Sequence, residues 1–219
     1  MKRIGLTGTL GAGKSTVGDL FEAWGAWRID ADRLARRAVQ PGTPGHAAVL
    51  ERFGDRVRAD DGSIDRAALR AIVFTDPDAR KALERIVHPE VDRLRAAEVE
   101  RAAGEGAEIV VYEVPLLYET GMESAFDRVV VVDAPPELRR RRVVETRGLT
   151  RETFDAIDGS QMPGEEKRDR ADVVVWNDGD EALLERRARV AWDAVTGVRW
   201  RVDLHMHTSA SRDCRSAPA

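Results

Sequence analysis

The segment that most constrains this chain is GTLGAGKS at residues 8–15, which matches the pattern G-x-x-x-x-G-K-[ST] in full. A short expected strand at residues 3–7 precedes it, and a segment with helical spacing of apolar residues, 14–24, follows it. This pattern binds phosphate when it joins a strand to a helix. The glycines let backbone N–H groups converge on phosphate oxygens, and the helix N-terminus adds partial positive charge. The sequence therefore predicts a phosphate-binding loop, or P-loop.

Each residue type in this loop has an expected role. Lys14 is expected to reach the β and γ phosphates of a nucleotide, and the Ser15 hydroxyl to bind Mg²⁺. ATP and Mg²⁺ are therefore the expected cofactors. The expected nucleotide contacts of the loop are Gly8, Gly11, Ala12, Gly13, Lys14, Ser15 and Thr16.

Apolar runs alternate with helical patterns along the chain. Strands are expected at residues 3–7, 27–29, 109–114, 128–133 and 173–176, and helices at 14–24, 32–39, 78–86, 90–103, 136–147 and 180–195. Runs that are apolar throughout are typical of parallel strands covered on both faces. The alternation predicts an α/β fold, a five-stranded parallel sheet flanked by helices. Residues 45–104 are helix-rich and charged, and we expect them to form a helical insertion in a core of 1–44 and 105–198.

Composition narrows the class of protein. The 219 residues are 42% hydrophobic and 34% charged, which is ordinary for a soluble globular chain. A net charge of −4 gives no basic field that would favour nucleic acid. No apolar run approaches the ~20 residues that span a bilayer. The single cysteine, Cys214, fits a reducing compartment. We expect a cytoplasmic protein with no nucleic-acid or membrane partner.

Two carboxylates, Asp30 and Asp32, follow the second expected strand, at the sheet edge where open α/β folds place ligands. Spacing of two in an extended segment would place both side chains on one side. One of them would then orient or deprotonate an acceptor hydroxyl. Helix capping is the alternative role. We favour Asp32 as the base and expect Asp30 to orient it or to cap the next helix.

The P-loop and the carboxylates together favour a small kinase. A GTPase would need a guanine-binding N-K-x-D motif, and the candidate WNDGD at residues 176–180 lacks the lysine. Three classes stay open at this point: a small-molecule kinase, a metal phosphoesterase fragment and a non-catalytic nucleotide binder.

Several segments jointly resemble one kinase family. GLTGTLGAGKST, IDAD, VHPEV (87–91), VPLLYE (114–119) and SQMPGEEKRDRADVVVWNDG (160–179) together resemble the dephospho-CoA kinases over about residues 1–197. The resemblance implies transfer of the ATP γ-phosphate to the ribose 3′-hydroxyl of dephospho-CoA, the last step of coenzyme A synthesis. It also implies a kinase domain at 1–198 with a mobile lid at about 139–168. The runner-up is another small-molecule P-loop kinase, of the shikimate or gluconate type.

The resemblance places substrate contacts in the later segments. His88 becomes a substrate-side contact, although Pro89 would also explain this site by opening a helix at its first turn. Gln161 lies in the last matching block, and Asn177 follows the last strand, where an adenine contact is expected. The substrate contacts expected after the third strand are Pro115, Leu116 and Glu119.

Some residues near these segments allow two interpretations. Leu116, Leu117 and Tyr118 would form either an apolar wall for the pantetheine arm or part of the core. Glu113, at the end of the third strand, would hold a water molecule on Mg²⁺. The loop residues Thr9 and Leu10 stand where the family often has Gly-Ile, and we expect this change to alter loop packing and leave the phosphate contacts intact.

A run of four arginines occupies residues 139–142. Such a run is usually a solvated helix face, but here it follows the fourth strand, where kinase lids lie. Arginine forks bind phosphate oxygens and stabilise transition-state charge. Alignment with the family pattern favours Arg142 as the catalytic lid arginine.

The tail at residues 199–219 does not resemble a kinase. Its segment RVDLHMHTSASRDC resembles the start of a PHP-type metal-dependent phosphoesterase. His205 and His207 would share one face of a strand, but a catalytic metal site needs at least three protein ligands. We expect the tail to be an incomplete fragment without catalytic function, and a chance sequence is the alternative.

Overall fold

The computed structural model describes residues 1–197, except for the side chain of Arg147, and contains one five-stranded parallel sheet in the order β2-β3-β1-β4-β5. The strands are β1 (Lys2–Gly8), β2 (Trp27–Asp30), β3 (Ile109–Glu113), β4 (Arg128–Asp133) and β5 (Val173–Trp176). The helices are α1 (Lys14–Ala23), α2 (Ala31–Ala38), α3 (Pro44–Phe53), α4 (Arg66–Thr75), α5 (Pro77–Gly104), α6 (Pro136–Arg147), α7 (Arg151–Gly159), α8 (Gly164–Asp169) and α9 (Glu181–Thr196). The predicted α/β fold with a five-stranded parallel sheet is confirmed.

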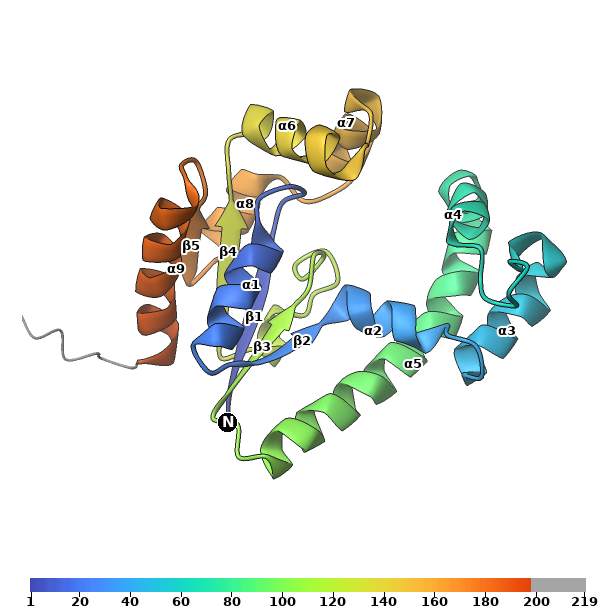
Figure 1. Ribbon diagram of the computed structural model, residues 1–219, viewed down its shortest axis with the longest axis horizontal. Coiled ribbons are helices and arrows are strands. Elements are labelled where there is room, and N and C mark those ends of the chain that lie inside the picture. Colours follow the sequence, from blue (N-terminus) through green and yellow to red (C-terminus); the bar gives the residue numbers. More distant parts are fainter. Residues whose placement is uncertain (198–219) are drawn as a thin grey trace, which may run out of the picture.

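Helices cover both faces of the sheet (Figure 1). On one face, Phe21 of α1 and Trp192 of α9 pack against Val130 of β4 in one hydrophobic cluster. On the other face, Leu34 of α2 and Ala102 of α5 belong to a second cluster with alternate residues of β3 and β4. Because both faces are buried, β3, β4 and β5 consist mainly of apolar residues.

The parallel register brings the carboxyl ends of all five strands to one edge. Gly8 is opposite Val132, and Asp30 is opposite Glu113. The chain therefore delivers the phosphate-binding loop and three acidic strand-end residues, Asp30, Glu113 and Asp133, to the same edge.

Helices α3, α4 and the first half of α5 form a body at the side of the sheet (Figure 1). This body has its own hydrophobic cluster, built around Val49, Phe53, Leu69, Ala79 and Ala82. Helix α2 packs on α5 and joins the body to the sheet.

Helix α5 differs from the sequence-based expectation. We expected two helices separated at His88-Pro89, but α5 runs without a break over 28 residues with Pro89 inside it. Proline removes one backbone hydrogen bond and usually kinks a helix. Figure 1 shows α5 changing direction along its length. Packing on both sides of Pro89 therefore outweighs the local cost of proline, and the interpretation of Pro89 as a first-turn residue is wrong.

Candidate active site

The loop after β1 has the backbone that a phosphate-binding loop requires. Gly11 and Gly13 have φ angles of +77° and +95°, in the left-handed region that favours glycine. A Cβ on Gly13 would lie only 2.4 Å from Nδ2 of Asn177. Helix α1 begins at Lys14, so its N-terminal N–H groups face the hollow of the loop.

Three side chains from other elements anchor this loop. Nδ2 of Asn177 donates to the carbonyl oxygen of Ala12 at 2.8 Å. Oγ1 of Thr9 donates to Oδ1 of Asp133 at 2.7 Å, and both side chains are buried. Arg139 donates to the carbonyl oxygen of Leu10 at 3.2 Å. Thr9, one of the two unusual loop residues, thus ties the loop to the end of β4.

A hydrogen-bonded chain of side chains lies next to the loop. Oγ of Ser15 donates to Oε1 of Glu113 at 2.9 Å. The other carboxylate oxygen of Glu113 accepts from Arg28 at 2.6 Å. Only 6% of the Glu113 side chain and 12% of the Arg28 side chain are exposed.

The residues present fit a magnesium ion that is held mainly by the nucleotide. Within residues 1–197 no group of three or more His, Cys, Asp or Glu side chains forms a metal site. A serine hydroxyl has one proton and two lone pairs. Because the Ser15 proton is used on Glu113, its lone pairs would remain available to hold Mg²⁺, a cation that prefers oxygen ligands.

The two aspartates after β2 have different environments. Asp30 is the N-cap of α2, and its Oδ1 accepts from the backbone N–H of Arg33 at 3.1 Å. Asp32 lies in the first turn of α2. The expectation that both residues share one side of an extended segment is therefore wrong, because the helix already begins at Ala31.

Burial raises the pKa of Asp32 above its ordinary value, and the charge of Asp30 raises it further. The positive charges of Lys14 and Arg36 act in the opposite direction but do not cancel the effect. Burial and a like charge disfavour the ionised form of a carboxyl, whereas a nearby cation favours it.

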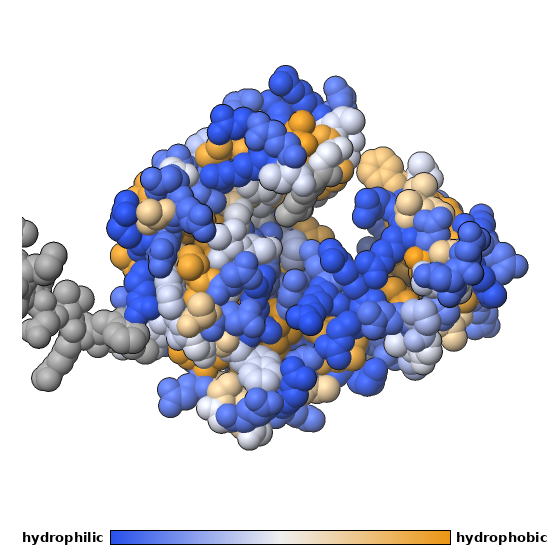
Figure 2. All heavy atoms as spheres, in the orientation of Figure 1, coloured by the Kyte–Doolittle hydropathy of each residue, from blue (hydrophilic) through white to orange (hydrophobic). Residues whose placement is uncertain are grey.

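A pocket of about 1030 Å³ joins the loop to the helical body. Figure 2 shows the surface hollowed between the part over α6 and α7 and the part over α3 and α4. The predicted site residues that line the pocket are Gly8, Lys14, Ser15, Asp32, His88, Pro115, Leu116 and Gln161. The structure therefore brings loop, carboxylate and acceptor-side residues together in one cavity.

The pocket also contains residues that sequence reasoning missed. Arg95 and Asp92 of α5 and the buried Tyr112 of β3 line it. Nε of Arg95 and Oε1 of Gln161 are buried and have no hydrogen-bond partner. No motif marks Arg95, but it lies seven residues after His88 and therefore on the same side of α5.

Other predicted residues do not line this pocket. Leu117 and Tyr118 are buried in the hydrophobic core, so they pack in the core and do not form a wall for the pantetheine arm. Leu116 differs, because it is 42% exposed and lines the pocket. The carboxylate of Glu119 accepts from Nζ of the buried Lys167 at 2.8 Å and from the backbone N–H of Met162 at 2.8 Å. Thr16 lies exposed in the first turn of α1.

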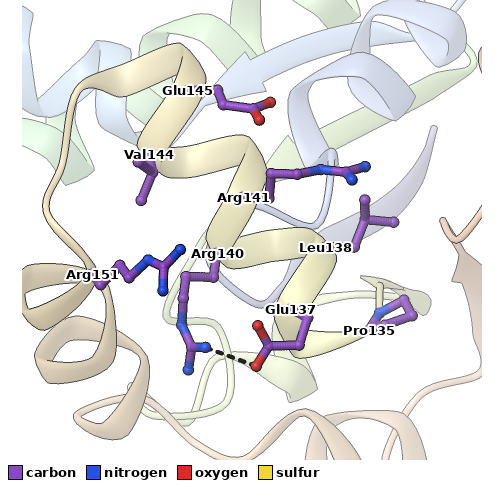
Figure 3. Close-up of a pocket in the computed structure, with 8 residues that line it drawn as sticks. All are labelled: Pro135, Glu137, Leu138, Arg140, Arg141, Val144, Glu145 and Arg151. Carbon is purple, nitrogen blue, oxygen red and sulfur yellow. Dashed lines mark hydrogen bonds and ion pairs between the residues drawn. The ribbon is translucent and has the colours of Figure 1, made fainter.

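The arginine run is split between different roles. Arg139 is buried and pairs with Asp158 of α7. Figure 3 shows Arg140 reaching Glu137 on one side of α6, while Arg141 extends from the opposite side. These residues line a separate hollow of about 550 Å³ that contains no loop residue. Arg142 alone of the four reaches Asn177, donating to its carbonyl oxygen at 3.2 Å and to Oδ1 at 3.1 Å.

Asn177 thus makes several hydrogen bonds within the protein that the sequence did not predict. Its side chain bonds both to the loop and to Arg142, and its backbone N–H donates to the carbonyl oxygen of Asp133. An adenine contact by Asn177 stays a prediction. The tail interpretation, with His205 and His207, concerns residues that lie outside 1–197.

The parallel sheet, the phosphate-binding loop and the acidic group opposite Ser15 define a P-loop phosphotransferase. The family model of dephospho-CoA kinase matches residues 2–182. The dephospho-CoA kinase of Streptomyces avermitilis is 48% identical over 192 residues, which are 88% of this chain and 93% of that protein. The chain belongs to the dephospho-CoA kinase family.

Solved structures agree with this assignment. The crystal structure of TT1252 from Thermus thermophilus is 40% identical, has a TM-score of 0.80, and is matched over 91% of this chain and 98% of that chain. Dephospho-CoA kinase from Campylobacter jejuni is 26% identical, has a TM-score of 0.66, and is matched over 90% and 99%. The chain is accordingly an ATP- and Mg²⁺-dependent kinase that catalyses the last step of coenzyme A synthesis. Within residues 1–197, no helix combines the length and apolar character needed to cross a bilayer.

Proposed function

We propose that Asp32 is the general base that accepts the proton of the ribose 3′-hydroxyl of dephospho-CoA. The observation that carries this proposal is the position of Asp32 in the same pocket as Lys14 and Ser15. Phosphoryl transfer needs the acceptor hydroxyl in line with the γ-phosphate, next to a group that can orient it. A raised pKa also suits a base, because proton transfer is most efficient when the pKa lies nearer the working pH.

The donor side is held by the loop. Lys14 and the loop N–H groups bind the β and γ phosphates and spread the charge that develops during transfer. Mg²⁺, when bound, neutralises charge on the same oxygens. Arg142 is the lid arginine in this proposal. Its bond to Asn177 holds it beside the loop, from which a guanidinium fork reaches a phosphate with a short rearrangement.

The acceptor side is formed by α5 and the segments after β3 and α7. His88, Gln161 and the segment Pro115–Leu116 line the same pocket as the loop, and we assign them to binding of dephospho-CoA. The unpartnered Oε1 of Gln161 supports this assignment, because a buried polar atom without a partner is costly unless a ligand satisfies it. Asp30 caps α2 and keeps Asp32 in place.

The proposal includes a lid and a cellular location. The segment at about 139–168 carries α6 and α7, and its closure over the pocket would exclude water and limit wasteful hydrolysis of ATP. We place the kinase in the cytoplasm, where ATP is available to it.

An acceptor screen with two matched variants tests the proposal. ATP consumption is measured with dephospho-CoA, shikimate, gluconate and nucleoside monophosphates, and we expect stimulation by dephospho-CoA. Asp32→Asn should lower kcat by about 10²–10⁴-fold and leave ATP binding nearly intact. Asp30→Asn is the control, because asparagine also caps helices, and its kcat should stay within a few-fold of the parent. A near-normal kcat for Asp32→Asn would exclude it as the base.

A further inference from the structure

We infer that Arg28 is a positioning residue for magnesium: it fixes the Glu113 carboxylate, which in turn orients the Ser15 hydroxyl. The inference rests on the role of Ser15 given above and extends it to a residue that no motif marks. Arg28 does not line the pocket that holds Lys14, Ser15 and Asp32, so it acts only through its neighbours.

Two partners from different elements fix the Glu113 carboxylate. This carboxylate lies at the end of β3 with only 6% of its side chain exposed. One oxygen accepts from Ser15 at 2.9 Å, and the other accepts from Arg28 at 2.6 Å. A carboxylate held at both oxygens by partners from different elements has one orientation, and that orientation sets the direction of the Ser15 O–H bond.

The bond to Glu113 fixes the orientation of the Ser15 hydroxyl. Because the proton of Ser15 points to Glu113, its lone pairs point elsewhere, and a cation needs those lone pairs. Outer partners that orient a metal-binding group in this way commonly control metal affinity. An unanchored Glu113 would let the hydroxyl rotate and offer its proton to the metal position.

Further contacts with α1 hold Arg28 in place. Its guanidinium also pairs with Asp19 and lies 3.7 Å from Oε2 of Glu22, both on α1. Gly18 provides the space, because a Cβ at that position would lie 2.8 Å from Nε of Arg28. The arginine thus links β2, β3 and α1, and its largely buried cation balances the acidic group that faces the phosphates.

The test compares nucleotide binding with and without Mg²⁺, measured by calorimetry with ADP, so that no turnover is needed. In the parent protein Mg²⁺ should tighten ADP binding. Arg28→Met should bring the ratio of the two Kd values towards one and leave the Mg²⁺-free Kd unchanged. In turnover assays, the Mg²⁺ concentration for half-maximal rate should rise by about 10–100-fold, with the KM for dephospho-CoA unchanged.

Asp19→Asn is the matched control. It removes the negative charge of the exposed partner of Arg28 and leaves the contact with Glu113, so its Mg²⁺ dependence should equal that of the parent. Equal losses in Asp19→Asn and Arg28→Met would show a merely structural role and overturn the inference. Unchanged Mg²⁺ dependence in Arg28→Met would overturn it as well, even if the protein still phosphorylates dephospho-CoA.

A double variant guards against loss of folding in Arg28→Met. Glu113→Gln removes the carboxylate that Arg28 holds, so adding Arg28→Met to it should cause no further change in Mg²⁺ dependence. The double variant leaves no unpaired carboxylate in this buried position. A further loss of several-fold in the double variant would mean that Arg28 acts independently of Glu113, which contradicts the inference.

Discussion

The buried Lys167 gives a stability prediction that can be worked out from its contacts. Its side chain is fully buried, and Nζ contacts Oε1 of Glu119 at 2.8 Å and the carbonyl oxygen of Pro115 at 3.2 Å. Lys167→Met keeps an unbranched side chain, one heavy atom shorter, and removes the charge. Breaking a buried ion pair from one side costs about 3–5 kcal/mol. We expect the lower end, about 3 kcal/mol, because Glu119 is 21% exposed and keeps its bond from Met162.

This loss is large enough to measure. For a chain of this size it corresponds to a fall in Tm of about 6–12 °C, and urea unfolding at pH 7 measures it as a free energy. Replacing both partners, Lys167→Met with Glu119→Gln, should recover most of the loss, because no unpaired charge remains. Lys81→Met is the control, since Lys81 is exposed and surface changes usually stay within about 0.5 kcal/mol.

The pair of Lys167 and Glu119 also determines the direction in which the stability of the folded chain changes with pH. Burial alone would raise the pKa of Glu119, but hydrogen bonds from Lys167 and from the Met162 N–H outweigh it, and the net pKa is lowered. A lowered pKa in the folded state adds stability above the ordinary glutamate pKa, and this stability disappears as the pH falls through the folded value. The gap between parent and Lys167→Met should therefore narrow below about pH 4. A loss under about 1 kcal/mol at pH 7, or no recovery in the double variant, would refute this account.

Three further predictions concern the loop and the base. Burial and the charge of Asp30 raise the pKa of Asp32. In a pH–rate profile, kcat/KM should therefore begin to fall on the acid side at a higher pH than an ordinary aspartate would give. Asp30→Asn should move this acid-side fall of kcat/KM to lower pH. Gly13→Ala forces a side chain into the left-handed region, so it should lower the free energy of unfolding by at least about 1–2 kcal/mol; an unchanged denaturation midpoint would contradict this. Thr9→Val removes the hydrogen bond to Asp133 and should cost about 1.5–3 kcal/mol in the same measurement, whereas Thr9→Ser should cost less because it keeps the hydroxyl.

The sequence predicted the sheet well because its strands carry their own signal. Residues 128–133 and 173–176 are short valine-rich runs between turn residues, and the structure has β4 and β5 at the same positions. Helix α6 also matches, because Pro136 marks its first turn and Gly148 follows its end. Such features are local, so they can be recognised without the rest of the chain.

Two errors came from local rules, one overridden by tertiary packing and the other by the start of a helix. Pro89 indicated a boundary, but α5 continues through it because both of its halves pack on other elements. The spacing of Asp30 and Asp32 indicated a shared side only for an extended chain, and α2 begins between them. In both cases the local backbone conformation differs from the one that the pattern indicated.

The pairings around the site had no sequence signal. Ser15 and Glu113 are 98 residues apart, and Ala12 and Asn177 are 165 apart. Neither pair belongs to a repeating pattern, and the parallel register of the sheet alone brings them together. Many residues of the site could therefore be named from motifs, whereas Arg95 and the pairings between residues, such as Arg28 with Glu113, required the fold.

The single kinked helix α5 joins two hydrophobic cores of one polypeptide. Ala79 and Ala82, before Pro89, belong to the core of the α3–α4 body, and Ala102, after it, belongs to the core under the sheet. Two cores on opposite sides of a missing backbone hydrogen bond allow the chain to open in two cooperative units at different free energies. His88 lies at this joint and lines the pocket, so an acceptor held by His88 and the P-loop together would couple the two units and raise the opening free energy of the smaller one.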